Sequence, residues 1–169
     1  MFIQYSLIIS LFLICISVAQ ASSLGINRPL AIVGQTKVSL YTFDLYNTEL
    51  YSPDGHYHPA MSEYAFKTTY LRDIKSQQLM KHTLKHWANL GIDPEEYAPY
   101  IPRLKELCRD VKKGDRFIAH ITPAQTDFYF NDQFVGSIQS PEFGPLFGAI
   151  WLSPNVSKPK LRAQLIGSI

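Results

Sequence analysis

The chain has 169 residues, a length that suits one domain, and 46% of them are hydrophobic against 18% charged. This balance is typical of a globular protein and excludes a disordered one. The net charge is only +2, and no run of Lys and Arg alternates with aromatic residues, which argues against a nucleic-acid partner.

An apolar segment, Leu7–Val18, lies near the start of the chain. It is short for a membrane span and has the length of the hydrophobic region of a secretory signal peptide. Ala19-Gln20-Ala21 follows it as an A-x-A cleavage site. We therefore expect residues 1–21 to be a signal peptide and residues 22–169 to be one exported domain. An uncleaved N-terminal anchor is the alternative, because no Lys or Arg precedes Arg28.

The two cysteines predict no internal disulfide. Cys15 lies inside the expected signal peptide, so the mature chain would keep Cys108 alone. Cys108 follows Leu104 at helical spacing and has no evident activating neighbour. We expect a buried core thiol rather than a nucleophile.

Extended structure is predicted over Lys37–Tyr51, which is rich in β-branched and aromatic residues. Alternation places Tyr46 and Thr48 on one face of this strand, and each face carries both polar and apolar residues. Pro53-Asp54-Gly55 marks a turn, and a returning strand is expected over Glu63–Leu71.

A helix is predicted from Asp73, as its N-cap, to Leu90, with Gly91 as the C-terminal stop. Asp93 and Pro94 open a second helical segment that ends near Cys108. In the first helix, Gln78, Lys81 and Lys85 fall toward solvent by their spacing. Its buried stripe is expected to hold Met80, Thr83, Leu84, Trp87 and Leu90.

Three short strands are predicted next, at Arg116–Ile121, Asp127–Phe130 and Phe134–Ile138, with a tight turn at Asn131-Asp132. Two helices complete the chain, one through Phe147 to Trp151 and one over Lys158–Leu165. Runs of strands beside runs of helices indicate an α+β fold, with an antiparallel sheet covered on one face.

Few residues stand out as carriers of chemistry. Arg72 lies at a strand-to-helix junction, from which a guanidinium can point into a cleft and bind a carboxylate or an enolate. The alternative is a surface ion pair with Asp73 or Glu63. His56 and His58 with Asp54, and His82 with His86, have spacings compatible with a metal, but a solvated turn and a cleft lining are favoured. We expect no metal and no cofactor.

Short motifs follow one another in a characteristic order between Gly34 and Gly167. They include Phe43-Asp44-Leu45-Tyr46, Tyr70-Leu71-Arg72-Asp73-Ile74, Val111-Lys112-Lys113-Gly114-Asp115-Arg116, Phe128-Tyr129-Phe130-Asn131, Ser140-Pro141-Glu142-Phe143 and Ile150-Trp151-Leu152. This ordered set resembles the bacterial chalcone isomerase-like domain. The resemblance implies an open-faced β-sandwich, in which a curved antiparallel sheet carries helices on one face with a cleft between them. Plant enzymes of this superfamily cyclise chalcones, some relatives bind fatty acids, and others have no known catalysis.

The resemblance also implies that the plant catalytic residues are replaced. The catalytic Arg falls on Gln35 or Thr36, and the strand Thr falls on Tyr46, as in the fatty-acid-binding branch. Counting back from the Trp87–Gly91 motif places Lys75 at the catalytic Tyr and His82 at the Asn. The enolate therefore loses its main electrostatic partner.

Our leading hypothesis is a non-catalytic, exported protein of the bacterial periplasm that binds a small apolar or carboxylate-bearing ligand, such as a fatty acid. After cleavage we expect no stable membrane insertion. The alternatives are an isomerase or intramolecular lyase acting on an enone-like substrate, and a structural or interaction protein of the envelope. The expected ligand contacts are Tyr46, Thr48, Arg72, Lys75 and His82.

Overall fold

The computed structural model describes residues 28–169, so the predicted signal peptide lies outside the described residues. Six strands form one antiparallel sheet in which every strand pairs with its neighbour in the chain, in the order β1-β2-β3-β4-β5-β6. The strands are β1 (Ala31–Leu40), β2 (Phe43–Ser52), β3 (Tyr64–Tyr70), β4 (Arg116–Ile121), β5 (Thr126–Phe130) and β6 (Gln133–Ile138).

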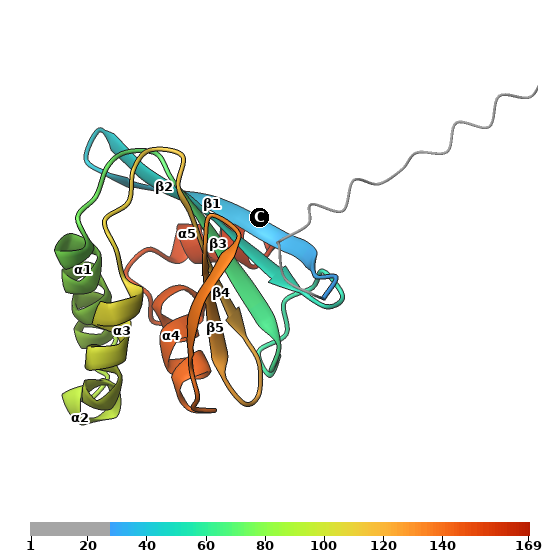
Figure 1. Cartoon of the computed structure of the whole chain (residues 1–169). Coiled ribbons are helices and arrows are strands. Elements are labelled where there is room, and N and C mark those ends of the chain that lie inside the picture. The colour runs from blue at the N-terminus through green and yellow to red at the C-terminus, as the bar shows by residue number, and fades with distance from the viewer. Residues whose placement is uncertain (1–27) are drawn as a thin grey trace, which may run out of the picture.

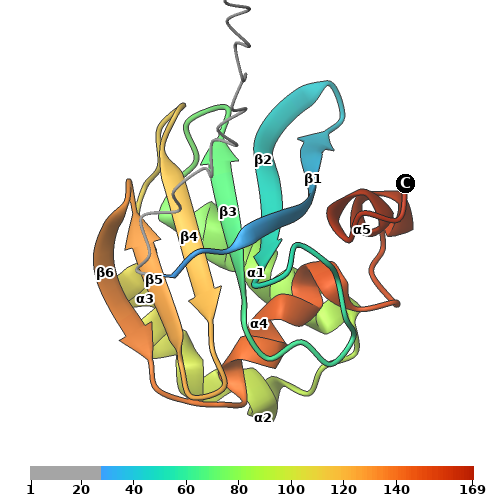
Figure 2. The same ribbon diagram turned by 90° about the vertical axis from the view of Figure 1, so that its right-hand side faces the viewer.

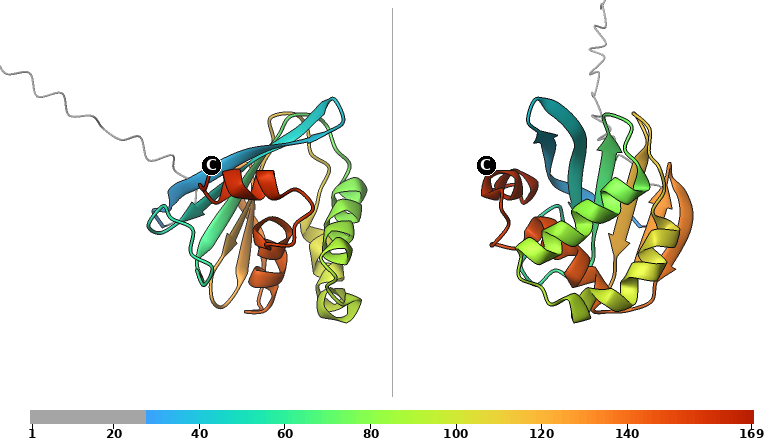
Figure 3. Two further views of the ribbon diagram at one scale, coloured as in Figure 1. Left: turned by 180° about the vertical axis from the view of Figure 1, so that it is seen from behind. Right: turned by 90° about the vertical axis from the view of Figure 1, so that its left-hand side faces the viewer.

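The helices gather on one face of the curved sheet (Figure 1). In Figure 2 the strands lie in front of the helices, whereas the right-hand view of Figure 3 shows α1 and α3 in front of the sheet. The predicted α+β open-faced β-sandwich is confirmed. The helices are α1 (Ser76–Asn89), α2 (Pro94–Tyr97), α3 (Ile101–Leu107), α4 (Phe143–Leu152) and α5 (Pro159–Leu165), with a 3-10 turn over Ala98–Tyr100.

The predicted single strand over Lys37–Tyr51 is wrong. A tight turn at Tyr41-Thr42 divides it into the end of β1 and most of β2. Tyr41 takes a left-handed conformation, with φ of 54°. The turn has none of the Gly, Pro, Asn or Asp residues that usually mark a reversal, so the composition predicts only extended structure.

The predicted start of the first helix is also wrong, because α1 begins at Ser76 and Lys75 takes the N-cap position. Ile74 forms an isolated antiparallel bridge with Val111, which keeps the chain extended there. The Asp73 carboxylate instead accepts a hydrogen bond of 2.9 Å from the backbone N–H of Lys113. The sequence signal for a cap was present, but a tertiary backbone pairing displaced it.

The other chain reversals follow the prediction. Gly91 ends the first helical segment in the left-handed region, with φ of 71°. Asp93 caps α2 by accepting a hydrogen bond of 2.9 Å from the N–H of Glu95. Asn131 and Asp132 both have positive φ, at 48° and 67°, which matches the twist that a two-residue hairpin needs.

The main core lies between the sheet and the helices. Phe66 of β3, Phe128 of β5 and Phe143 of α4 are each at most 2% exposed. Trp87 of α1 is fully buried, and its indole N–H donates a hydrogen bond of 2.9 Å to the Leu146 carbonyl of α4. Each such aromatic side chain contributes about 1.5–3 kcal/mol on burial, so this cluster fixes α1 and α4 to the sheet.

The C-terminal helix α5 packs against the edge strand β1. Gly34 leaves no room for a side chain, because a Cβ there would collide with the backbone oxygens of Gln164 and Leu165. The Thr36 hydroxyl donates a hydrogen bond of 2.7 Å to the Gln164 side chain. This close approach covers part of the sheet edge.

The outer face of the sheet is packed by its own side chains. Tyr51, Ala65 and Ile118 form a small buried cluster. Beside it, Lys67 pairs with Glu49 at 3.0 Å, and both side chains are largely shielded from solvent. Within residues 28–169, none of the helices has the length and apolar character required to cross a bilayer.

Candidate functional site

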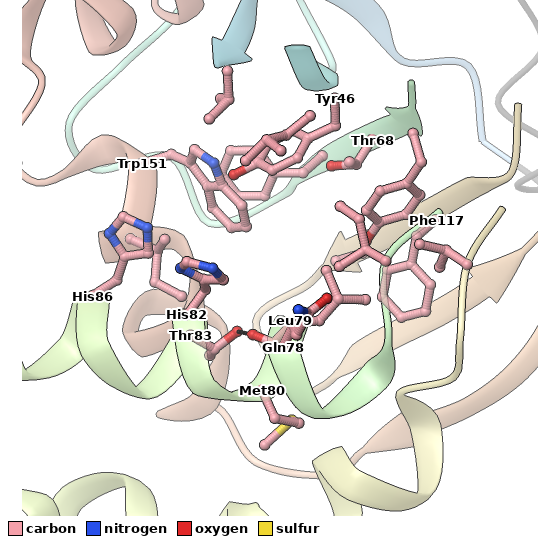
Figure 4. Close-up of a pocket in the computed structure, with 18 of the residues that line it drawn as sticks. Tyr46, Thr68, Gln78, Leu79, Met80, His82, Thr83, His86, Phe117 and Trp151 are labelled. Atoms are coloured by element: carbon pink, nitrogen blue, oxygen red, sulfur yellow. Dashed lines mark hydrogen bonds between the residues drawn. The ribbon is translucent and has the colours of Figure 1, made fainter. Parts of the chain in front are cut away.

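A cavity of about 550 Å³ lies between the inner face of the sheet and α1. Tyr46, Thr68 and Phe117 line it from the strands, and Trp151 lines it from α4 (Figure 4). The volume falls within the usual range for small-molecule sites, which is about 300–1,000 Å³.

Helix α1 turns a polar face toward this cavity. Gln78, His82 and His86 recur every four residues on that face, and in Figure 4 both imidazoles point upward from the helix. Leu84 and the buried Trp87 pack in the main core instead, whereas Met80 both packs against that core and lines the cavity. Gln78 and Lys85 also line the cavity, and both remain exposed to solvent, as the helical pattern predicted.

Two tyrosines supply hydroxyl groups at the sheet side of the cavity. The register pairs Tyr46 of β2 with Tyr70 of β3, and their rings meet edge to face at 6.0 Å between centroids. Burial raises the pKa of Tyr46 to about 12, although the Trp151 indole N–H partly offsets this effect. Burial also raises the pKa of Tyr70. Both phenols therefore stay protonated at neutral pH and remain able to donate a hydrogen bond.

The charged side chains that line the cavity are nearly all positive. Asp73 is the single acidic residue among the described residues of the lining, and its carboxylate already accepts the Lys113 N–H. A cavity lined in this way favours an anionic group. The cationic lining residues are Arg72, Lys85, Arg109, Lys158 and Arg162.

Arg72 lies where the β1–β2 hairpin meets the cavity. Its guanidinium stacks over the Phe43 ring, 4.9 Å from the centroid. It forms neither of the ion pairs weighed from the sequence. Glu63 instead pairs with Arg28 at 2.7 Å, and Asp73 bonds to the Lys113 backbone.

A second group of cations lies around His86. Burial lowers the pKa of His86, and the nearby charges of His82, Lys158 and Lys85 lower it further. The Lys158 ammonium donates a hydrogen bond of 3.1 Å to the Ser39 carbonyl, which brings the segment before α5 to the end of β1. Lys158 and Arg162 also line the cavity but were not predicted as ligand contacts, because they lie far along the chain from α1.

Of the five predicted ligand contacts, Tyr46, Arg72 and His82 line the cavity. Thr48 is fully buried outside the lining, and its hydroxyl shares a hydrogen bond of 3.1 Å with Thr68, which does line it. Lys75 also lies outside the lining and pairs with Asp110 at 2.7 Å.

The remaining candidates do not form a reactive centre. Burial raises the pKa of the Cys108 thiol to about 11, which disfavours the thiolate a nucleophile needs. His58 pairs with Asp54 at 2.9 Å in the segment after β2. In the part of the chain that the structure describes, no three His, Cys, Asp or Glu side chains are grouped as metal ligands.

A curved antiparallel sheet with an internal cavity beneath its helix-covered face defines the class of open-faced β-sandwich proteins. Residues 19–167 match the family described as chalcone isomerase-like. The chain therefore belongs to the chalcone isomerase-like family.

The chain is similar to other proteins both in sequence and in fold. An uncharacterised protein of Haemophilus influenzae is 22% identical over 158 residues, which cover 94% of this chain and 77% of the relative. The crystal structure of a fatty-acid-binding protein of Arabidopsis thaliana superposes with a TM-score of 0.60 at 11% identity. That match covers 85% of this chain and 89% of the plant protein, and at this identity it shows a shared fold.

Proposed function

We propose that the protein is an exported, non-catalytic binder of a small apolar molecule with an anionic head, and that a fatty acid is the ligand class. The observation that carries this proposal is the cavity of about 550 Å³, in which apolar walls meet five cationic side chains and one engaged carboxylate. The name of the Arabidopsis fatty-acid-binding protein, which shares the fold, supports the choice of ligand.

The apolar walls supply the affinity for the ligand tail. Leu79 and Phe117 face the cavity from α1 and β4, and Ile150 and Trp151 face it from α4. Burying one methylene group contributes about 0.8 kcal/mol. A tail of about ten methylenes therefore gains roughly 8 kcal/mol, which corresponds to micromolar affinity before ordering costs.

Arg72 and Tyr46 recognise the head group in this proposal. A guanidinium binds a carboxylate through two parallel hydrogen bonds, and the stacking on Phe43 holds Arg72 in place for that contact. The protonated Tyr46 hydroxyl donates to the same head group. The proposal is specific for an ionised head and predicts weaker binding of an uncharged one.

The binder is favoured over the enone isomerase by the position of Thr36. The family pattern places the catalytic Arg of the plant enzymes at Gln35 or Thr36. Thr36 lines the cavity with a neutral side chain, and its hydroxyl is committed to Gln164. The stabilisation of a developing enolate therefore lacks its charged donor at that position.

Export is the second part of the proposal and rests on Leu7–Val18 and the A-x-A site that ends at Ala21. N-terminal sequencing of the protein from the soluble periplasmic fraction tests it. A chain that begins at Ser22 is the expected result. A chain that still begins at Met1 and fractionates with membranes would establish an anchor instead.

Titration with a fatty acid and with its methyl ester tests the ligand. We expect the free acid to bind and Arg72→Ala to weaken it by at least about tenfold, because a charged hydrogen bond contributes about 1.5–3 kcal/mol. Lys75→Ala is the matched control, since its charge pairs with Asp110 outside the cavity. Equal affinity for acid and ester, or no binding of either, would overturn the proposal.

A further inference from the structure

The tip of the β1–β2 hairpin exposes a cluster of large apolar side chains. Leu40 is 45% exposed, Tyr41 93% and Phe43 58%. Only three other large hydrophobic residues of the described chain are exposed to this degree, and none of those lies in the tip. The tip projects past the rest of the sheet on the side of α1 (Figures 1 and 3).

The backbone of the tip is strained around its most exposed aromatic ring. Tyr41 has φ of 54°, a conformation that costs a residue with a side chain roughly 1 kcal/mol and costs glycine nothing. A ring exposed by 93% recovers none of this cost through packing within the chain. Strain held at an exposed aromatic residue is typical of a functional position.

Cationic side chains surround the tip. Arg72 stacks on Phe43, and Lys37, although paired with Asp44 at 3.0 Å, is half exposed. The loop that carries the exposed Lys112 and Lys113 is tied to the same end of the sheet. Two backbone donors make this tie, the Lys113 N–H to Asp73 and the Gly114 N–H to the Tyr70 carbonyl at 2.8 Å.

The tip is continuous with the rim of the cavity. Leu40 belongs to the exposed cluster and also lines the cavity, together with Leu45 and Arg72. An apolar molecule that leaves the cavity along these side chains reaches the tip without passing a row of acidic side chains.

We propose that the β1–β2 tip docks on an anionic lipid bilayer and is the portal through which the apolar ligand passes between membrane and cavity. Tyrosine and phenylalanine rings at such a tip enter the interfacial layer, and the surrounding cations contact lipid phosphates. A bilayer fits better than a protein partner, because a stable protein interface buries about 800 Å² on each side and the tip holds only three large apolar side chains.

Cosedimentation of the chain from Ser22 onward with vesicles of equal parts phosphatidylglycerol and phosphatidylcholine tests the docking. This chain keeps all the described residues, including the core described above. We expect binding that weakens with added salt and on pure phosphatidylcholine. Replacing both Tyr41 and Phe43 by Ser should lower the partition coefficient by at least about tenfold.

The double variant Ile32→Ser, Phe134→Ser is the matched control, since these side chains are 51% and 59% exposed elsewhere on the sheet. It should bind vesicles within about twofold of the wild type. Tyr41→Gly separates loss of docking from misfolding, because it removes the ring and also relieves the strain of the turn. This variant should bind vesicles more weakly than the wild type. It should unfold at no lower denaturant concentration.

The docking is independent of the proposed ligand, because vesicle binding is measured without fatty acid and fatty-acid titration without vesicles. Absence of vesicle binding would overturn the proposal that the tip is a membrane portal. Equal vesicle binding by the Tyr41/Phe43 and the Ile32/Phe134 double variants would overturn it too. Self-association that the Tyr41 and Phe43 substitutions abolish, without any vesicle binding, overturns it as well and assigns the tip to a second copy of the chain.

Discussion

The layer between the sheet and the helices is filled by core side chains at one end, the solid end, and contains the cavity at the other, the hollow end. At the solid end, Trp87 and Phe143 are fully buried outside the cavity lining, and their rings pack on Tyr97 and Tyr100 with centroids 4.9 and 5.0 Å apart. At the hollow end, Tyr46 of β2 and His82 of α1 line opposite sides of the cavity (Figure 4). The same two layers thus provide a packed core and an open site.

This difference shows that different residues of the same layer provide stability and ligand binding. Aromatic burial at the solid end holds α4 and α1 on the sheet, so the hollow end does not need to be filled. Polar side chains tolerated at the hollow end include Thr68, Gln78 and His86. A truncation should therefore lower stability at one end and ligand affinity at the other.

Phe143→Ala should have the largest effect. It removes a fully buried ring that does not line the cavity, and we expect the free energy of unfolding to fall by about 3–5 kcal/mol. Phe117→Ala changes the same residue type at the cavity wall and should lower the free energy of unfolding by less than about 2 kcal/mol. Urea unfolding of both variants measures the contrast, and equal losses would contradict the division into two ends.

Filling the hollow end should abolish binding at little cost to the fold. Leu79→Trp places a larger side chain in the cavity, so fatty-acid affinity should fall by at least about tenfold while the free energy of unfolding changes by less than about 1 kcal/mol.

Leu84→Trp is the control for this substitution, because Leu84 lies on the core side of the same helix. Overpacking there should lower the free energy of unfolding by about 1–3 kcal/mol and leave affinity unchanged. A strongly destabilised Leu79→Trp would show that the cavity wall is packed like the core.

The smallest effect expected is a pH dependence of binding. The pKa of His86 is lowered in the free protein, so the imidazole is neutral at neutral pH. A bound anion favours the charged imidazole and raises this pKa, so binding takes up a proton. Affinity for a fatty acid should therefore rise severalfold as the pH falls from about 7 to about 5.5, by less than tenfold per pH unit for one proton.

His86→Ala should flatten this dependence when affinity is measured across the same pH range. His58→Ala, which alters a His–Asp pair outside the cavity, is the control and should leave the slope unchanged. A slope that survives in His86→Ala would assign proton uptake to another group.

Much of the strand and helix order was predictable from local signals. The reversal at Asn131-Asp132 and the cap at Asp93 depend on the conformational preferences of single residues, so short windows reveal them. The turn at Tyr41 was not predictable, because its residues carry no turn signal and the chain adopts the strained conformation in its tertiary context. The start of α1 was displaced for the same reason, by the Ile74–Val111 bridge.

The candidate site was predictable only in part. Tyr46, Arg72 and His82 stood out by their position in a strand, a junction and a helix, and all three line the cavity. Lys158 and Arg162 carry no local signal, because their role depends on α5 packing beside β1. Thr48 and Lys75 were predicted as ligand contacts on equal grounds, yet neither lines the cavity. Thr48 hydrogen-bonds to Thr68, and Lys75 forms an ion pair with Asp110.

The sequence by itself determined the class and the family of this protein, because composition, hydrophobic period and ordered motifs are properties of the chain alone. Through the family resemblance it also predicted that the plant catalytic residues are replaced. Only the tertiary structure decided that a cavity exists, which charges surround it and that an apolar tip lies at its rim. The hydrophobic period of a sequence shows which side chains share one face of a helix or strand. The surface that packs against that face comes from segments far along the chain, and only the tertiary structure brings the two together.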